Sequence, residues 1–107
     1  MNVIDLHKEK LFKLCAQHRV KELYAFGSIL TDKFNEKSDV DLLIQFQRMP
    51  LKDYLDNYME LKEKLEELFQ RPIDLVENQT IKNPIFRKAI DRDKKIIYER
   101  KDSEILV

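Results

Sequence analysis

The fold is decided by residues 27–41, Gly-Ser-Ile-Leu-Thr-Asp-Lys-Phe-Asn-Glu-Lys-Ser-Asp-Val-Asp. An apolar run at residues 23–26 leads into this stretch. The run, Leu-Tyr-Ala-Phe, predicts a buried strand. Gly27 is the only glycine of the chain, and it allows a sharp turn and a close approach of the backbone to a ligand. Ser28 is suited to cap a short helix over residues 29–33, whose free N–H groups would attract an anion. The stretch therefore predicts a strand, a tight turn and a phosphate site.

Two carboxylates stand at the start of the next predicted strand, over residues 40–46. Residues two apart share one face of a strand, so Asp39 and Asp41 are expected to project together. The alternate residues are expected to face the core: Val40, Leu42 and Ile44. Neighbouring carboxylates repel each other unless a cation lies between them, and Mg²⁺ is usually held by one or two carboxylates plus substrate phosphates. Together with the Gly-Ser turn, this pair predicts a site for a magnesium–nucleoside triphosphate.

Helices and strands alternate in the rest of the chain. Helices are predicted at residues 4–18, at residues 51–69, and from Pro84 to about Asp91 with Asn83 as the N-cap. Strands are predicted at residues 21–26, 40–46, 73–76 and 96–98, the last of them at an edge. A turn is predicted at residues 91–93, and a frayed tail at residues 101–107. This alternation predicts an α/β fold with one sheet.

The composition indicates one soluble domain, over residues 1–107. Charged residues make up 37% of the chain, yet the formal net charge is +0, so there is no overall basic field to indicate nucleic-acid binding. The lone cysteine, Cys15, cannot form an internal disulfide and is typical of a reducing compartment. Since no apolar run approaches the length of a membrane span, we expect a cytoplasmic protein.

The pair Gly27-Ser28 with Asp39-x-Asp41 resembles the signature of the polymerase-β-type nucleotidyltransferases. The spacing and the small size are most similar to their minimal branch, the MNT proteins, which are paired with HEPN-domain toxins in prokaryotic toxin–antitoxin modules. The resemblance continues downstream, at residues 71–76 and 83–87. It implies a nucleotidyltransferase fold, in which a single mixed sheet has helices packed mainly on one side.

The resemblance also implies a role for each candidate residue. Transfer to a hydroxyl attacks the α-phosphate of ATP and expels pyrophosphate, and two metal ions about 3.5–4 Å apart can clamp the attacking and leaving groups. Asp39 and Asp41 would bind both Mg²⁺ ions. Asp74, from a neighbouring strand, would bind the catalytic ion and help to activate the acceptor hydroxyl. Gly27 and Ser28 would bind the β- and γ-phosphates.

The chain departs from the minimal branch directly after the Gly-Ser pair. That branch often has arginines and a glycine where residues 29–32 are Ile-Leu-Thr-Asp here. Lys33 and Lys37 are candidates to replace those arginines as phosphate ligands, and ordinary loop lysines are the alternative. Asp74 has the alternative of a solvent-facing strand residue, in which case Glu77 is the weaker candidate for the third carboxylate.

The function implied is a Mg²⁺-dependent transfer of AMP from ATP to a tyrosine hydroxyl of a HEPN toxin. Because the nucleotidyltransferase pattern covers nearly the whole sequence, we expect the acceptor to be presented by a partner. Two alternatives remain at this point. One is an antitoxin that acts by binding alone and has a vestigial site, and the other is a small-molecule nucleotidyltransferase that needs a separate acceptor-binding subunit.

Overall fold

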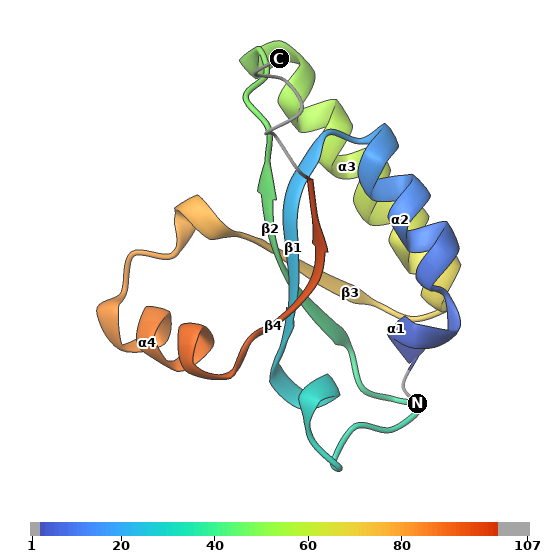
Figure 1. The fold of residues 1–107 in the computed structure, drawn as a ribbon, viewed down its shortest axis with the longest axis vertical. Coiled ribbons are helices and arrows are strands. Elements are labelled where there is room, and N and C mark those ends of the chain that lie inside the picture. The colour runs from blue at the N-terminus through green and yellow to red at the C-terminus, as the bar shows by residue number, and fades with distance from the viewer. Residues whose placement is uncertain (1–2, 101–107) are drawn as a thin grey trace.

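The computed structural model describes residues 3–100 and is built around a four-stranded sheet with the strand order β3-β2-β1-β4 (Figure 1). The strands are β1 (Val20–Phe26), β2 (Val40–Phe46), β3 (Ile73–Glu77) and β4 (Lys95–Glu99). Strand β1 pairs antiparallel with both β2 and β4, whereas β2 and β3 are parallel. The expected single mixed sheet is therefore confirmed, and β4 lies at its edge as predicted.

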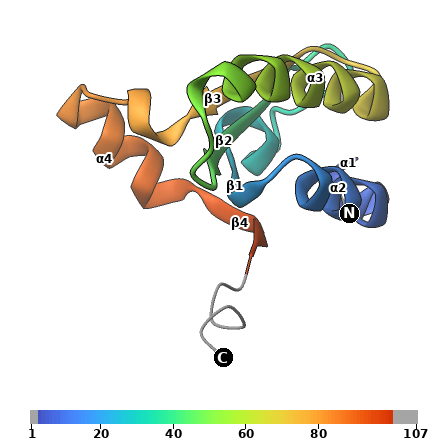
Figure 2. The same ribbon diagram turned by 90° about the horizontal axis from the view of Figure 1, so that it is seen from above.

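Most of the helical structure covers one face of this sheet. The helices are α1 (Val3–Leu6), α2 (Lys8–Gln17), α3 (Leu51–Phe69) and α4 (Pro84–Asp93), with short 3-10 helices η1 (Gly27–Leu30) and η2 (Asn78–Thr80). Figure 2 shows α2 and α3 together on one side, with α4 beyond the sheet from them. Among residues 3–100, no helix has both the length and the apolar character needed to cross a membrane.

The main core lies between the sheet and the helices α2 and α3. Alternate residues of β1 and β2 point into it, which confirms the predicted inward face of β2. Its fully buried members include Leu11, Leu23, Leu42, Ile44, Leu61 and Leu65. Leu43 and Ile90 are also buried but lie outside this cluster. Since Leu43 shares the face of Asp41, part of the opposite face is covered as well, on the side where α4 lies.

The predicted helix over residues 51–69 is confirmed with the same bounds, but the helix predicted over residues 4–18 is wrong in one respect. The chain breaks at His7, whose φ of −116° and ψ of 22° are not helical. Helix α1 ends with a hydrogen bond from the His7 N–H to the Ile4 carbonyl, 3.1 Å long. The break turns the His7 ring edge-on to Phe69, with 5.6 Å between the ring centroids.

The predicted turn at residues 91–93 is also wrong, because these residues are the last three of α4. Helix α4 closes with a hydrogen bond of 2.8 Å from the Lys94 N–H to the Ile90 carbonyl. At its other end, the predicted cap is confirmed, since the Asn83 side chain accepts hydrogen bonds from two N–H groups of the first turn. The tail at residues 101–107 lies outside the described residues.

Truncation of a buried leucine of α3 should test the packing of this helix on the sheet. Leu65 is 1% exposed and Leu55, in the same helix, is 63% exposed. We expect Leu65→Ala to lower the free energy of unfolding by about 2–5 kcal/mol, because it leaves a cavity in the core. The matched change Leu55→Ala should lower it by about 0.5 kcal/mol or less. Urea denaturation followed by circular dichroism measures both, and equal losses would contradict this packing.

Candidate active site

The pairing of the strands brings the predicted carboxylates to one end of the sheet. Asp41 lies opposite Asp74 in the parallel pair of β2 and β3. Asp41 also lies opposite Phe26 in the antiparallel pair of β1 and β2, and Gly27 is the next residue after Phe26. Three neighbouring strands thus place the glycine turn and two of the three acidic residues side by side.

A side chain at position 27 would collide with Asp41 unless that carboxylate moved. Its φ is +77°, in the left-handed region that favours glycine. A Cβ built on it would lie 2.4 Å from Oδ2 of Asp41. The backbone turn and the carboxylate are therefore in direct contact, and the turn that the sequence predicts at Gly27 is confirmed.

The segment after Gly27 is shorter than predicted. In place of a helix over residues 29–33, a 3-10 helix spans Gly27–Leu30, so Ser28 lies inside the helix rather than at its cap, which is Phe26. The Ser28 carbonyl accepts hydrogen bonds from the N–H and the hydroxyl of Thr31, at 2.9 and 2.8 Å. The apolar residues that stand in place of the family's arginines anchor this turn, because Ile29 is buried and Leu30 packs against the core.

The three aspartates differ in their exposure. Asp39 precedes β2 and is exposed, Asp41 is half-buried, and Asp74 is exposed between the buried residues Ile73 and Leu75. Burial raises the pKa of the Asp41 carboxyl above its usual range, and the negative charges of Asp74 and then Asp39 raise it further. The three side chains are therefore close enough for their charges to interact.

The donors at this end of the sheet fit Mg²⁺ in their chemistry. They are carboxylate oxygens, which this hard ion prefers. The pKa of Asp41 is raised by burial first and by the charges of Asp74 and Asp39 second, and a bound cation would offset both effects. Among residues 3–100, no three histidine, cysteine or carboxylate side chains lie together as a ready metal centre. Mg²⁺ does not require one, because substrate phosphates and water commonly complete its coordination. Two bound ions remain a prediction.

Glu77 lies on the other face from Asp74. It is three residues further along β3, and successive side chains of a strand alternate between faces. Its carboxylate accepts a hydrogen bond from the Tyr54 hydroxyl of α3, and burial together with this contact raises the pKa of Tyr54. Glu77 is thus engaged with the helical layer, which leaves Asp74 as the candidate third carboxylate.

Lys33 and Lys37 both lie exposed in the loop between η1 and β2. The Lys33 N–H donates to the Thr31 hydroxyl at 3.2 Å, and the Lys37 N–H donates to the Asn35 side chain at 2.8 Å. These contacts fix the backbone of the loop. Their side chains remain candidates for contact with phosphate.

Sequence reasoning missed other side chains on the face that Asp41 shares. Tyr24 pairs with Leu43, and Phe26 pairs with Asp41, so both aromatic rings lie on this face. The Nζ atom of Lys94 lies 4.5 Å from the centroid of the Tyr24 ring. The alternation of residues within the apolar run was an available signal for the two rings, whereas Lys94 comes near only through the folding of α4.

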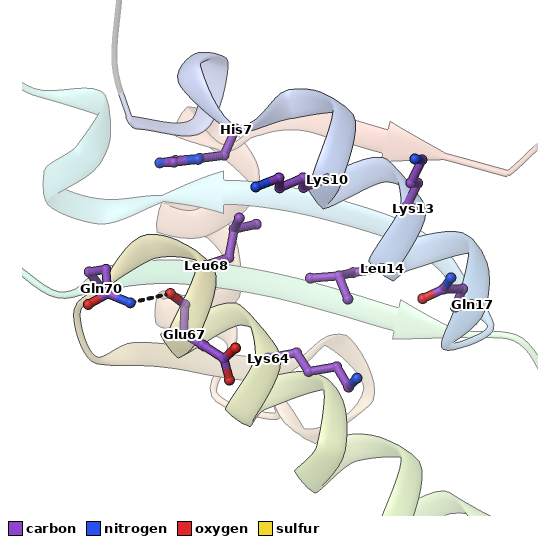
Figure 3. A pocket seen from close by; sticks show the side chains of 9 residues that line it. All are labelled: His7, Lys10, Lys13, Leu14, Gln17, Lys64, Glu67, Leu68 and Gln70. Carbon is purple, nitrogen blue, oxygen red and sulfur yellow. Dashed lines mark hydrogen bonds between the residues drawn. The ribbon is translucent and has the colours of Figure 1, made fainter.

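A groove of about 500 Å³ lies elsewhere, between α2 and α3 on the helical side of the sheet. Figure 3 shows Lys10 and Lys13 on its α2 wall and Lys64 on its α3 wall. The full lining is His7, Lys10, Lys13, Leu14, Gln17, Lys64, Glu67, Leu68 and Gln70. No candidate residue for catalysis or nucleotide binding is in this set, so the groove is separate from the carboxylate site.

The fold is similar to that of solved structures. A structure described as a "putative minimal nucleotidyltransferase" is similar with a TM-score of 0.71 and 29% identity, and the match covers 89% of this chain and 95% of that one. An MNT antitoxin in complex with a tri-AMPylated HEPN toxin, from Shewanella oneidensis, has the same fold. Its TM-score is 0.62 at 18% identity, and the match covers 95% of this chain and 77% of that one.

Comparison of sequences gives the family. "Putative protein adenylyltransferase MJ0128" of Methanocaldococcus jannaschii is 36% identical over 92 residues, which are 86% of this chain and 88% of that protein. Protein adenylyltransferase MntA of Thermococcus cleftensis is 32% identical over 89 residues, 83% of this chain and 84% of that protein. The sequence profile described as "Polymerase beta, Nucleotidyltransferase" matches residues 9–103. The chain therefore belongs to the polymerase beta nucleotidyltransferase family of enzymes.

Proposed function

We propose that this enzyme transfers AMP from ATP to a tyrosine hydroxyl of a HEPN toxin and thereby acts as its antitoxin. The observation that carries the proposal is the strand register, which sets Asp41 opposite Asp74 and beside the turn at Gly27. Two similarities support it. The relatives are named protein adenylyltransferases, and the fold is shared with an MNT antitoxin in complex with a tri-AMPylated HEPN toxin.

In the proposed reaction, the tyrosine oxygen forms a bond to the α-phosphorus of ATP, and the bond from that phosphorus to the pyrophosphate oxygen breaks. The exposed carboxylate of Asp74 accepts the proton of the hydroxyl, as a general base. An acceptor carried by another protein can reach Asp74 because this side chain is open to solvent. AMP is thus attached to the tyrosine, and pyrophosphate leaves.

The remaining candidate residues bind the nucleotide. Asp39 and Asp41 would hold Mg²⁺, which when bound neutralises the negative charge of the phosphates. Gly27 has no side chain to obstruct a phosphate, and Ser28 and Lys33 would contact the β- and γ-phosphates. A lysine binds phosphate as a point charge, without the paired hydrogen bonds of an arginine.

A second candidate is an antitoxin that acts by binding alone. A row of exposed apolar side chains on α3 favours it, because it offers a surface to a partner protein. The row contains Leu51, Leu55 and Met59, which are 85%, 63% and 56% exposed and are spaced four residues apart along one face of the helix. Such a surface is also compatible with an enzyme that holds its protein substrate, so transfer itself must be measured.

The first test is binding of the nucleotide. We expect calorimetry to detect ATP binding that requires Mg²⁺ and is lost in Asp39→Asn/Asp41→Asn, because the pair supplies the carboxylates for the ion. Asp32→Asn changes an exposed aspartate of the same loop and should bind as wild type does. Undiminished binding by a folded double variant would contradict the assignment of the pair.

The second test uses the raised pKa of Asp41. Because the pKa is raised in the folded chain, the ionised carboxyl lowers the free energy of unfolding at pH 7. This penalty disappears as the pH falls below about 3.9, the pKa of an unfolded aspartate. Without Mg²⁺, Asp41→Asn should therefore unfold at higher urea concentration than wild type at pH 7, with the difference shrinking toward pH 3. Added Mg²⁺ should stabilise wild type more than the variant. A variant less stable than wild type at pH 7 would contradict the inference that the ionised Asp41 destabilises the fold.

The third test separates Asp74 from the other two aspartates. The cognate HEPN toxin, incubated with the enzyme, ATP and Mg²⁺, should gain mass in increments of AMP. We expect Asp74→Asn to bind Mg²⁺–ATP within a few-fold of wild type but to transfer at least about 10²-fold more slowly, since it loses the base and the ligand for the catalytic ion but keeps Asp39 and Asp41. Single-turnover mass spectrometry measures the rate. A tight, neutralising complex without any mass change would favour the binding-only antitoxin.

A further inference from the structure

Arg71 joins the loop between η1 and β2 to the start of β3. Its Nη1 atom donates hydrogen bonds to the carbonyl oxygens of Asn35 and Ser38, each 3.1 Å long. The guanidinium also lies over the ring of Phe34, with its Cζ atom 4.7 Å from the ring centroid. One side chain therefore contacts three residues that are more than 30 positions away in the sequence.

The part of the loop held by Arg71 is a closed turn. The Ser38 N–H donates to the Asn35 carbonyl at 3.0 Å, and the Asn35 N–H donates to the Ser38 hydroxyl at 3.0 Å. Asp39 follows this turn directly, and the next N–H, of Val40, donates to the Pro72 carbonyl at 3.2 Å. The contacts of Arg71 thus end one residue before Asp39.

The chemistry of the contacts suits an arginine. A planar guanidinium can donate to two carbonyls and stack on an aromatic ring at the same time, which an ammonium does less well. Its Nε atom is buried without a hydrogen-bond partner among the described residues, an unfavourable arrangement for a polar group. The orientation of the side chain is therefore set by the carbonyls and the ring.

We infer that Arg71 is a positioning residue, which ties the loop carrying Asp39 to the strand carrying Asp74. Asp74 lies three residues after Arg71 on β3, and Asp39 one residue after the turn that Arg71 holds. The tie fixes two of the three carboxylates relative to each other before the nucleotide binds. This inference rests on the proposed function for its effect on catalysis, but the tie itself can be measured without nucleotide.

Hydrogen exchange in the nucleotide-free protein tests the tie. In Arg71→Met, which keeps an apolar stem over Phe34 but loses both hydrogen bonds, the amides of Lys37, Ser38 and Val40 should exchange about tenfold faster by NMR. Arg48→Met, at an exposed arginine in the loop after β2, should leave their exchange unchanged. Unchanged exchange in a folded Arg71→Met would overturn the inference whatever the protein's activity.

The dependence of transfer on Mg²⁺ tests the consequence. We expect Arg71→Met to need about tenfold more Mg²⁺ for half-maximal AMP transfer, with excess Mg²⁺ restoring part of the rate, and Arg71→Lys to be intermediate. A loss of ATP affinity with normal exchange would make Arg71 a direct phosphate ligand and overturn the inference. Faster exchange with normal Mg²⁺ dependence would overturn the positioning role. A wild-type protein that transfers nothing would instead defeat the proposed function, which the exchange measurement does not depend on.

Discussion

The parallel pairing of β2 with β3 is the constraint on which the site depends. Parallel neighbours need a long crossover between them, and α3, with 19 residues, provides it here. The helix is held on the sheet by buried side chains, and β3 is held in register by the buried pair Ile73 and Leu75 on either side of Asp74. A slip of one residue would exchange Asp74 with a buried leucine. The same packing that buries the apolar residues of β3 therefore keeps its carboxylate on the open face.

This arrangement places like charges beside the backbone turn at Gly27. Asp41 is half-buried, has Asp74 as its strand neighbour and lies against the turn at Gly27. Such a cluster opposes the stability of the protein when no cation is present. The fold tolerates it because the core beneath is formed by other residues of the same strands, with Leu42 and Ile44 fully buried. The buried core and the clustered carboxylates thus lie on opposite faces of one strand.

The sequence predicted the features that follow from local periodicity. The helix at residues 51–69 and the alternation around Asp74 depend on side chains a few residues apart, and both are confirmed. The break at His7 was not predictable in this way, because the ring of His7 turns toward Phe69, at the far end of α3. Residues 91–93 are charged residues of a kind common in turns. They nevertheless form the end of α4, whose last hydrogen bond is donated by the N–H of Lys94.

In the candidate site, too, some features follow from the local sequence and others depend on contacts between distant segments. Spacing indicated Gly27, Asp39 and Asp41, whereas the role of Asp74 came from the resemblance to the family. The strand register places Asp41 and Asp74 together. Arg71 and Lys94 contact distant segments, Arg71 at the loop before β2 and Lys94 at Tyr24. A lone arginine or lysine has no local pattern that distinguishes such a contact from ordinary exposure, so only the folded chain reveals it.

The contact between Gly27 and Asp41 also links the two positions in evolution. A Cβ at position 27 would meet the carboxylate of Asp41, so replacing this glycine would displace the carboxylate and would also strain a backbone with a φ of +77°. A smaller residue in place of Asp41 would remove the first obstacle but not the second, because the left-handed backbone would still favour glycine. In a lineage that abandons catalysis, we therefore expect the aspartate to be replaced more readily than the glycine.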